Sequence, residues 1–143
     1  MDASKKSPNR PSILLVERDV LVRTPLAAYL RECGYIVIES GSGEEALLVL
    51  QQQQFRVDVL LTDADLPGPL DVFSLVQKAR ASRAGVRTLI AATPERAAAL
   101  AGQLCEDGPL LSKPYAPHRI AERIRQLLAL RRRSDESESS EPN

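Results

Sequence analysis

Short, continuous apolar runs alternate with segments of helical periodicity along this chain, and this alternation constrains the fold more than any other feature. A half-exposed strand alternates apolar and polar residues, whereas a strand that is covered on both faces is apolar throughout. The runs therefore predict an α/β fold of five strand–helix units, a doubly wound parallel sheet with strand order 2-1-3-4-5. The runs lie at 13–16, 35–38, 57–61, 88–92 and, more weakly, 110–111.

The segments between the runs predict helices. The first, over 20–33, has one apolar face, made of Val22, Leu26, Tyr29, Leu30 and Cys33. Asp19 and Asp71 stand where an N-cap is expected before the first and third helices. Pro25 lies inside the first helix, so that helix is expected to bend or to start late. The other helices are expected over 43–54, over 71–82, from Pro94 onward, and from Pro117 to near Leu130.

Length and terminal composition predict one domain with two loose ends. The chain has 143 residues, about the length of a single domain. We expect a flexible arm over 1–11 and a folded domain over 12–133. Residues 134–143 include four acidic residues and no basic or apolar one, which predicts a disordered acidic tail.

Composition excludes several classes of protein. The formal net charge is zero and aromatic residues make up 3% of the chain, so few side chains could stack on bases, and we expect no nucleic-acid partner. No apolar run approaches the roughly 18 residues that cross a bilayer, and the N-terminus lacks a signal peptide. Cys33 and Cys105 are too far apart for a zinc or disulfide motif. We therefore expect a cytoplasmic protein with no membrane partner.

The chemistry is expected where the parallel strands end, because ligands of doubly wound sheets bind beyond the carboxyl ends of the strands. Acids, a hydroxyl and a lysine follow the predicted strands, in the segments 17–19, 62–65, 93 and 112–114. None of these segments is a glycine-rich phosphate cradle, which disfavours dinucleotide binding and P-loop chemistry. A carboxylate beside other acids, a cation and a hydroxyl suits acceptance of a phosphoryl group as an acyl phosphate.

Across nearly all of residues 12–130 the chain resembles the receiver domains of two-component response regulators, whose fold is flavodoxin-like. Four stretches carry the resemblance, in order: 13–19, 57–68, 89–93 and 111–115. The resemblance implies that Asp63 is the phosphoacceptor, Lys113 the phosphate-binding lysine and Thr93 the switch hydroxyl. It also implies that Glu17 is one of two metal-site acids after the first strand, and that Asp65 offers its backbone carbonyl to Mg²⁺.

Three residue choices depart from the family pattern. Arg18 stands where the family has its second acid, normally a ligand of Mg²⁺. Leu110 replaces an aromatic residue that turns inward on activation, and the loop 67–71 lacks a second glycine. We expect Arg18 to make Mg²⁺ binding weak or absent. Its guanidinium could pair with Asp63 or Glu17, or turn into solvent while Asp19 or water completes the metal shell.

The sequence thus predicts a single-domain response regulator that is not an enzyme beyond self-phosphotransfer and slow autodephosphorylation. Its expected partner is a sensor histidine kinase or a histidine phosphotransfer protein. A homodimer through the fourth helix, fifth strand and fifth helix is also expected, because the segment 94–104 is rich in alanine and leucine. Two alternatives stay open: a pseudo-receiver that acts without phosphorylation, which Arg18 favours, and a flavodoxin-like binder of small molecules, which only the architecture favours.

Overall fold

A computed structural model describes residues 10–93, 110–112 and 116–139. Five parallel strands form one sheet in the order β2-β1-β3-β4-β5, which confirms the predicted topology. The strands are β1 (Ser12–Val16), β2 (Ile36–Ser40), β3 (Val59–Asp63), β4 (Arg87–Ala92) and β5 (Leu110–Ser112). In β2 and β3, pairing with the neighbouring strand continues beyond the predicted apolar runs. Both strands therefore end two residues later than those runs.

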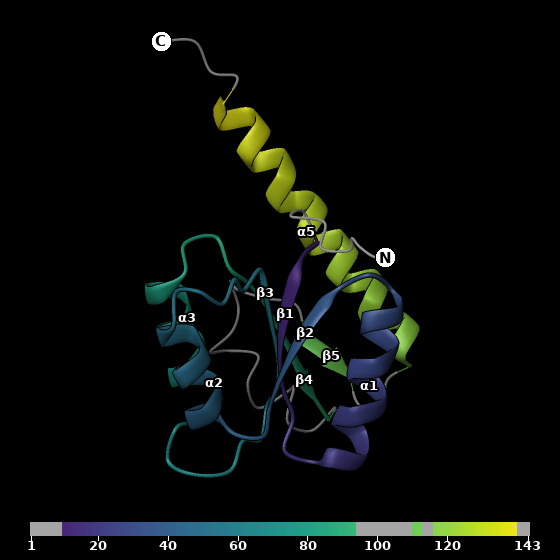
Figure 1. Cartoon of the computed structure of the whole chain (residues 1–143), viewed down its shortest axis with the longest axis vertical. Coiled ribbons are helices and arrows are strands. Elements are labelled where there is room, and N and C mark those ends of the chain that lie inside the picture. Colours follow the sequence, from purple (N-terminus) through teal and green to yellow (C-terminus); the bar gives the residue numbers. More distant parts are fainter. Residues whose placement is uncertain (1–9, 94–109, 113–115, 140–143) are drawn as a thin grey trace.

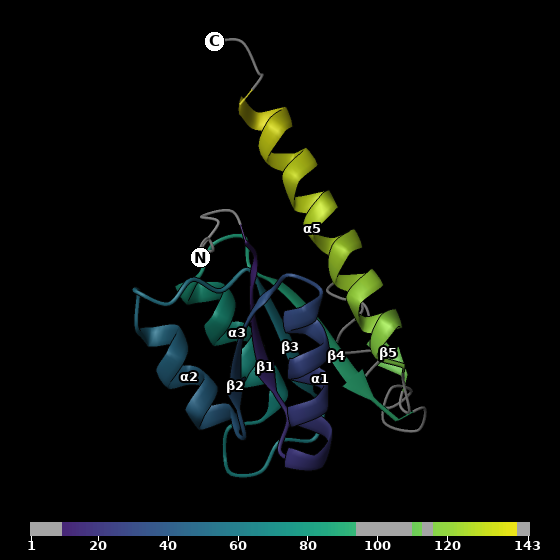
Figure 2. The same ribbon diagram turned by 45° about the vertical axis from the view of Figure 1, so that its right-hand side comes forward.

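Helices cover both faces of the sheet: α1 and α5 lie on one side, and α2 and α3 on the other (Figure 1, Figure 2). Their bounds are α1 (Val20–Glu32), α2 (Gly43–Gln51), α3 (Val72–Ser82) and α5 (Pro117–Ser139). The helix expected from Pro94 lies outside the described residues. Among the described helices, none is long and apolar enough to span a bilayer.

The core consists of two clusters separated by the sheet. Every residue of β1 and β3 is buried, as the continuous apolar runs predicted. Because side chains alternate along a strand, Leu14 and Val16 pack towards α2 and α3, whereas Ile13 and Leu15 pack towards α1 and α5. This double cover fixes the strands, and therefore the places where they end.

The helix ends follow the predicted capping chemistry. The Asp19 carboxylate accepts a hydrogen bond from the Leu21 amide at 3.0 Å, and the Asp71 carboxylate accepts one from the Ser74 amide at 2.9 Å, so both predicted N-caps are confirmed. Gly34, at φ +102°, ends α1: its amide donates to Arg31, and the next amide donates back to Leu30.

One expectation for the first helix is wrong, and one of the two alternatives given for Pro25 is excluded. Val22 and Cys33 are exposed, because the buried stripe of α1 runs through Leu26, Ala27 and Leu30 instead. The helix begins at Val20 with Pro25 inside it, so it does not start late. Proline has no amide to donate to Leu21, whose side chain is 81% exposed, so water can satisfy that carbonyl.

Described contacts and helix bounds extend past both ends of the predicted domain, residues 12–133. The Pro11 carbonyl accepts a bond from the Ile36 amide at 2.9 Å and Arg10 donates to the Gly34 carbonyl at 3.0 Å, so these two residues belong to the folded domain. At the other end, α5 continues to Ser139 instead of ending near Leu130. A helix that is already nucleated on the core adds further residues at little cost, even without apolar side chains.

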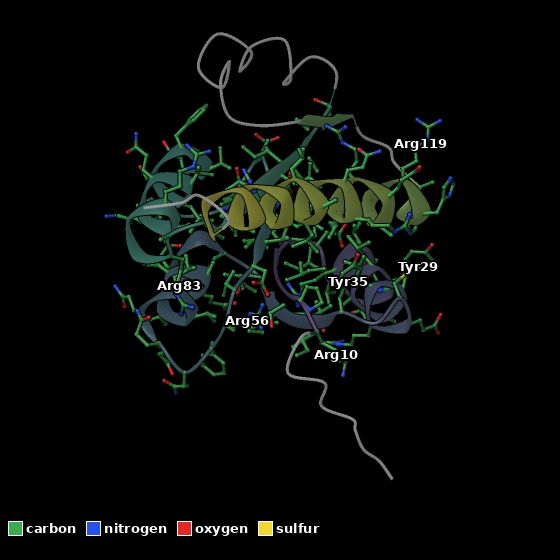
Figure 3. All side chains as sticks on the ribbon, turned by 90° about the horizontal axis from the view of Figure 1, so that it is seen from above. Arg10, Tyr29, Tyr35, Arg56, Arg83 and Arg119 are labelled. Carbon is green, nitrogen blue, oxygen red and sulfur yellow. The ribbon has the colours of Figure 1, made fainter. Side chains whose placement is uncertain are left out.

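The amino ends of the strands are tied together by charged side chains. The buried Asp58 carboxylate accepts a bond from the Ser12 amide at 2.8 Å and pairs with Arg56 at 3.1 Å. Arg10 donates to backbone carbonyls between α1 and β2 at the same end, which Figure 3 views from above. Charged side chains therefore fix the amino end of the sheet, whereas its carboxyl end is bordered by the loops that follow the strands.

Candidate functional site

Glu17 and Asp63 lie next to each other where β1 and β3 end. Val16 is in register with Thr62, so the residues that follow them stand on adjacent strands at the same level. Both are buried: Glu17 is 4% exposed and Asp63 is 7% exposed. Carboxylates are rarely buried unless they bind a cation or hydrogen-bond donors, so two of them at one sheet edge mark a candidate site.

The backbone around Glu17 is held by three hydrogen bonds. Its Oε2 accepts a bond from the Asp19 amide at 3.1 Å, and its own amide donates to the Ser40 carbonyl at 3.0 Å. Arg23 of α1 donates from its Nη1 to the Glu17 carbonyl at 2.8 Å and pairs with Glu39 of β2 at 3.3 Å. The acid therefore has a fixed position between β1, β2 and α1.

Asp63 is the last residue of β3, so its backbone is fixed by the sheet. The next residue, Ala64, donates to the Ala91 carbonyl of β4 at 2.9 Å, and the Thr62 hydroxyl donates to the Asp63 carbonyl at 3.0 Å. The Asp63 Oδ1 accepts a bond from the Asp65 amide at 3.3 Å, which leaves Asp65 itself exposed just beyond the strand. The carboxylate is thus presented at the rim of the sheet.

The other predicted site residues lie at different places. Arg18 is exposed and, among the described residues, makes no ion pair with Asp63 or Glu17. Thr93 is exposed one residue past the end of β4. Lys113 lies outside the described residues, directly after β5, and the side chain of Leu110 lies outside them as well. The structure thus brings two of the predicted side chains, Glu17 and Asp63, together.

These residues offer oxygen ligands suited to Mg²⁺. Mg²⁺ is bound through one or two carboxylates and keeps several waters, which fits Glu17, Asp63 and the Asp65 backbone carbonyl. Among the described residues no group of three or more acidic, histidine or cysteine side chains could hold a metal ion.

The loop after Asp63 has contacts that sequence reasoning missed. Glu44, in the first turn of α2, accepts a bond from the Leu70 amide through its Oε2 at 3.1 Å. Sequence reasoning explained Glu44 by the helix dipole alone, because a contact between residues 26 positions apart leaves no local signal. At the end of the same loop, hydrogen bonds from Ser74 hold the pKa of the Asp71 carboxyl below its ordinary value.

Comparison with known proteins identifies the same family that the sequence resembles. The family model for the response regulator receiver domain matches residues 13–125. The probable transcriptional regulator ycf27 of Cyanophora paradoxa is 29% identical over 120 residues, which cover 84% of this chain and 49% of that protein. The chain spans half or less of the length of the curated relatives that it matches.

Solved structures share the fold over most of their length. The receiver domain of the hybrid histidine kinase CckA is 31% identical, with a TM-score of 0.68 over 82% of this chain and 98% of that chain. A response regulator receiver protein from Sinorhizobium medicae WSM419 is 22% identical, with a TM-score of 0.79 over 87% of this chain and 99% of that chain. With the buried acids at the ends of β1 and β3, these matches show that the chain belongs to the response regulator receiver domain family.

Proposed function

We propose that Asp63 accepts a phosphoryl group from a phosphohistidine of a sensor histidine kinase or a histidine phosphotransfer protein. The observation that carries this proposal is the placement of buried Asp63 at the end of β3, beside Glu17 and two residues before exposed Asp65. A carboxylate oxygen of Asp63 attacks phosphorus, the phosphorus–nitrogen bond breaks, and the imidazole leaves with its electron pair and takes up a proton. Water later hydrolyses the acyl phosphate.

The surrounding residues have distinct roles in this proposal. Glu17, Asp63 and the Asp65 carbonyl would hold Mg²⁺, which when bound supplies positive charge to the phosphoryl oxygens. Lys113 adds a second positive charge to the same oxygens. Thr93 donates a hydrogen bond to the acyl phosphate and signals its presence to the partner surface. The module signals through protein–protein contacts and catalyses nothing beyond self-phosphotransfer and slow autodephosphorylation.

Arg18 is expected to weaken the cation site. Its exposed guanidinium replaces a ligand and adds repulsion, which solvent reduces to about 1 kcal/mol for unit charges about 4 Å apart. Arg18→Asp removes the repulsion and restores a carboxylate, so Mg²⁺ should bind about tenfold more tightly. Titration with Mg²⁺ followed by NMR measures this, and equal millimolar-or-better affinity in both proteins would refute the role of Arg18.

The test of function is incubation with a small phosphodonor, with and without Mg²⁺, followed by intact mass. One added phosphoryl group that disappears in Asp63→Asn supports the proposal. If wild type gains no phosphoryl group but still binds a kinase or target, the pseudo-receiver alternative replaces it. A coloured or nucleotide-bound purified protein would instead favour the small-molecule binder.

The homodimer through the fourth helix, β5 and α5 stays a proposal, because residues 94–109 lie outside the described residues. Small side chains in that segment would let a second backbone approach closely. Ala98→Glu and Ala101→Glu should each weaken self-association without lowering the unfolding midpoint. Sedimentation of both variants measures this, and wild-type behaviour in both would place the dimer surface elsewhere.

A further inference from the structure

The first turn of α2 is joined to the loop that follows Asp63. Leu70 donates its amide to the Glu44 carboxylate at 3.1 Å. One residue earlier, the buried Gly43 packs so closely that an added Cβ would lie 2.8 Å from the Leu70 carbonyl oxygen. Side chain and backbone of the same turn thus contact the same residue, so α2 and the loop cannot shift independently here.

A second close contact fixes where the Glu44 carboxylate lies. Gly68 has a φ of +87°, and a Cβ added there would lie 3.0 Å from Oε1 and 3.1 Å from Oε2 of Glu44. The carboxylate therefore lies directly against the loop backbone from Gly68 to Leu70. The positive φ favours glycine at this position, and any Cβ there would displace the carboxylate.

We propose that Glu44 is a positioning residue for the cation site, which it serves by holding the loop that presents the Asp65 carbonyl. This proposal rests on the phosphoacceptor function proposed above. The loop is anchored at its start by Asp63, in β3, and at its end by Asp71, the N-cap of α3. Between these anchors, the Glu44 carboxylate of α2 accepts the Leu70 amide of the loop.

Coupling between two sites is reciprocal, so cation binding should in turn tighten the contact between Glu44 and the loop. Release of the Leu70 amide would give the loop alternative conformations in which the Asp65 carbonyl does not face the cation. Cation binding would then have to select one of these conformations, which lowers the apparent affinity. The maximal rate of phosphoryl transfer should be unchanged once Mg²⁺ saturates the site.

Glu45 provides a matched control in the same helical turn. Its Oε1 accepts the Gly41 amide at 2.8 Å, so Glu45→Ala removes the same charge and the same kind of hydrogen bond without touching the loop. Glu44→Gln keeps an acceptor oxygen but has no charge, so it tests the contribution of the hydrogen bond separately from that of the charge. Urea midpoints of all three variants identify any loss of global stability.

The experiment measures three quantities: the exchange rate of the Leu70 amide without metal, the Mg²⁺ concentration at half-saturation by NMR, and the maximal phosphorylation rate. Glu44→Ala should exchange Leu70 about tenfold faster and raise the half-saturation concentration at least about tenfold, the lower range for residues that support metal ligands. Glu45→Ala and Glu44→Gln should stay within about twofold of wild type, and all three should keep the maximal rate.

Equal Mg²⁺ half-saturation in Glu44→Ala and Glu45→Ala would overturn the proposal. So would a reduced maximal rate with unchanged half-saturation, because that pattern indicates damage to the chemical step. A wild type that binds Mg²⁺ but accepts no phosphoryl group defeats only the proposed function, since the titration still decides the role of Glu44. A wild type that binds no Mg²⁺ defeats the proposal for Glu44 itself.

Discussion

Arg83 joins α3 to the end of α2, and its removal gives a stability prediction that can be worked out from the structure. From the C-cap of α3, its guanidinium donates to the Leu50 carbonyl from Nε at 3.3 Å and from Nη2 at 3.2 Å. Nη2 also donates to the Gln52 carbonyl at 2.8 Å, and Nη1 donates to the Phe55 carbonyl. Figure 3 shows Arg83 beside these helices. One side chain thus satisfies three carbonyls at and after a helix C-terminus.

Arg83→Met keeps an unbranched apolar stem and removes the donors. A hydrogen bond to a charged group contributes about 1.5–3 kcal/mol when it is buried, but water can replace the donor at these partly exposed carbonyls. We therefore assign each of the three carbonyls about 0.7 kcal/mol, for a total of about 2 kcal/mol. With a urea slope near 2 kcal/mol per molar, the midpoint should fall by about 1 M.

Urea denaturation followed by far-UV circular dichroism measures the change. Lys78→Met is the control, because Lys78 is an exposed cation on the same helix. Arg83→Lys should give an intermediate loss, since an ammonium group cannot serve three separated carbonyls as a planar guanidinium does. The reasoning is refuted if Arg83→Met lowers the midpoint no more than Lys78→Met does.

Three further predictions concern capping and the sheet edge. The Arg31 Nη2 donates to the Val37 carbonyl at 2.8 Å, and Arg31→Ala leaves this carbonyl of the β2 edge exposed. Self-association through that edge should increase in light scattering at high concentration, and scattering equal to wild type would contradict this. Asp71→Asn keeps an oxygen that can accept the Ser74 amide, but removes a carboxyl whose lowered pKa adds stability above its unfolded pKa. That stability is lost as pH falls through the folded pKa, so urea midpoints of the variant should fall less in acid; equal slopes would contradict this. Gly34→Ala, with no atom within 4 Å of the new Cβ, should cost about 1 kcal/mol in urea unfolding from backbone strain alone, and no loss would contradict the strain.

The sheet could be predicted because its signals are local. Continuous apolar runs indicated strands that are covered on both faces. Asp19 and Asp71 indicated helix starts, because each carboxylate accepts a hydrogen bond from an amide two or three residues later. The predicted strand order made β1 and β3 neighbours, and the observed register places Glu17 beside Asp63. The family resemblance added their roles, which periodicity alone does not contain.

What the sequence did not predict depends on contacts between distant residues. Glu44 against the β3–α3 loop and Arg83 across the end of α2 join residues 26 and 33 positions apart. The exposure of Val22 has a different cause: the apolar stripe of a helix is wider than the strip that a neighbouring element covers. Arg18 could be identified as unusual from its position in the sequence. That position did not predict whether the side chain turns towards the acids or, as the structure has it, is exposed.

The length of α5 has a consequence for how the molecule responds to heat. Its 23 residues extend over about 34 Å, whereas the five residues of β1 extend over about 17 Å, so the helix continues well past the sheet (Figure 1, Figure 2). Among the residues whose side chains are described, those of its first half pack on the core, through Ile120, Ala121 and Ile124. We expect the projecting turns to unwind gradually on warming, before the core unfolds, because helices fray from their ends. Far-UV ellipticity should show a sloping baseline below the main transition, while tyrosine signals from the core stay level until the sheet itself melts.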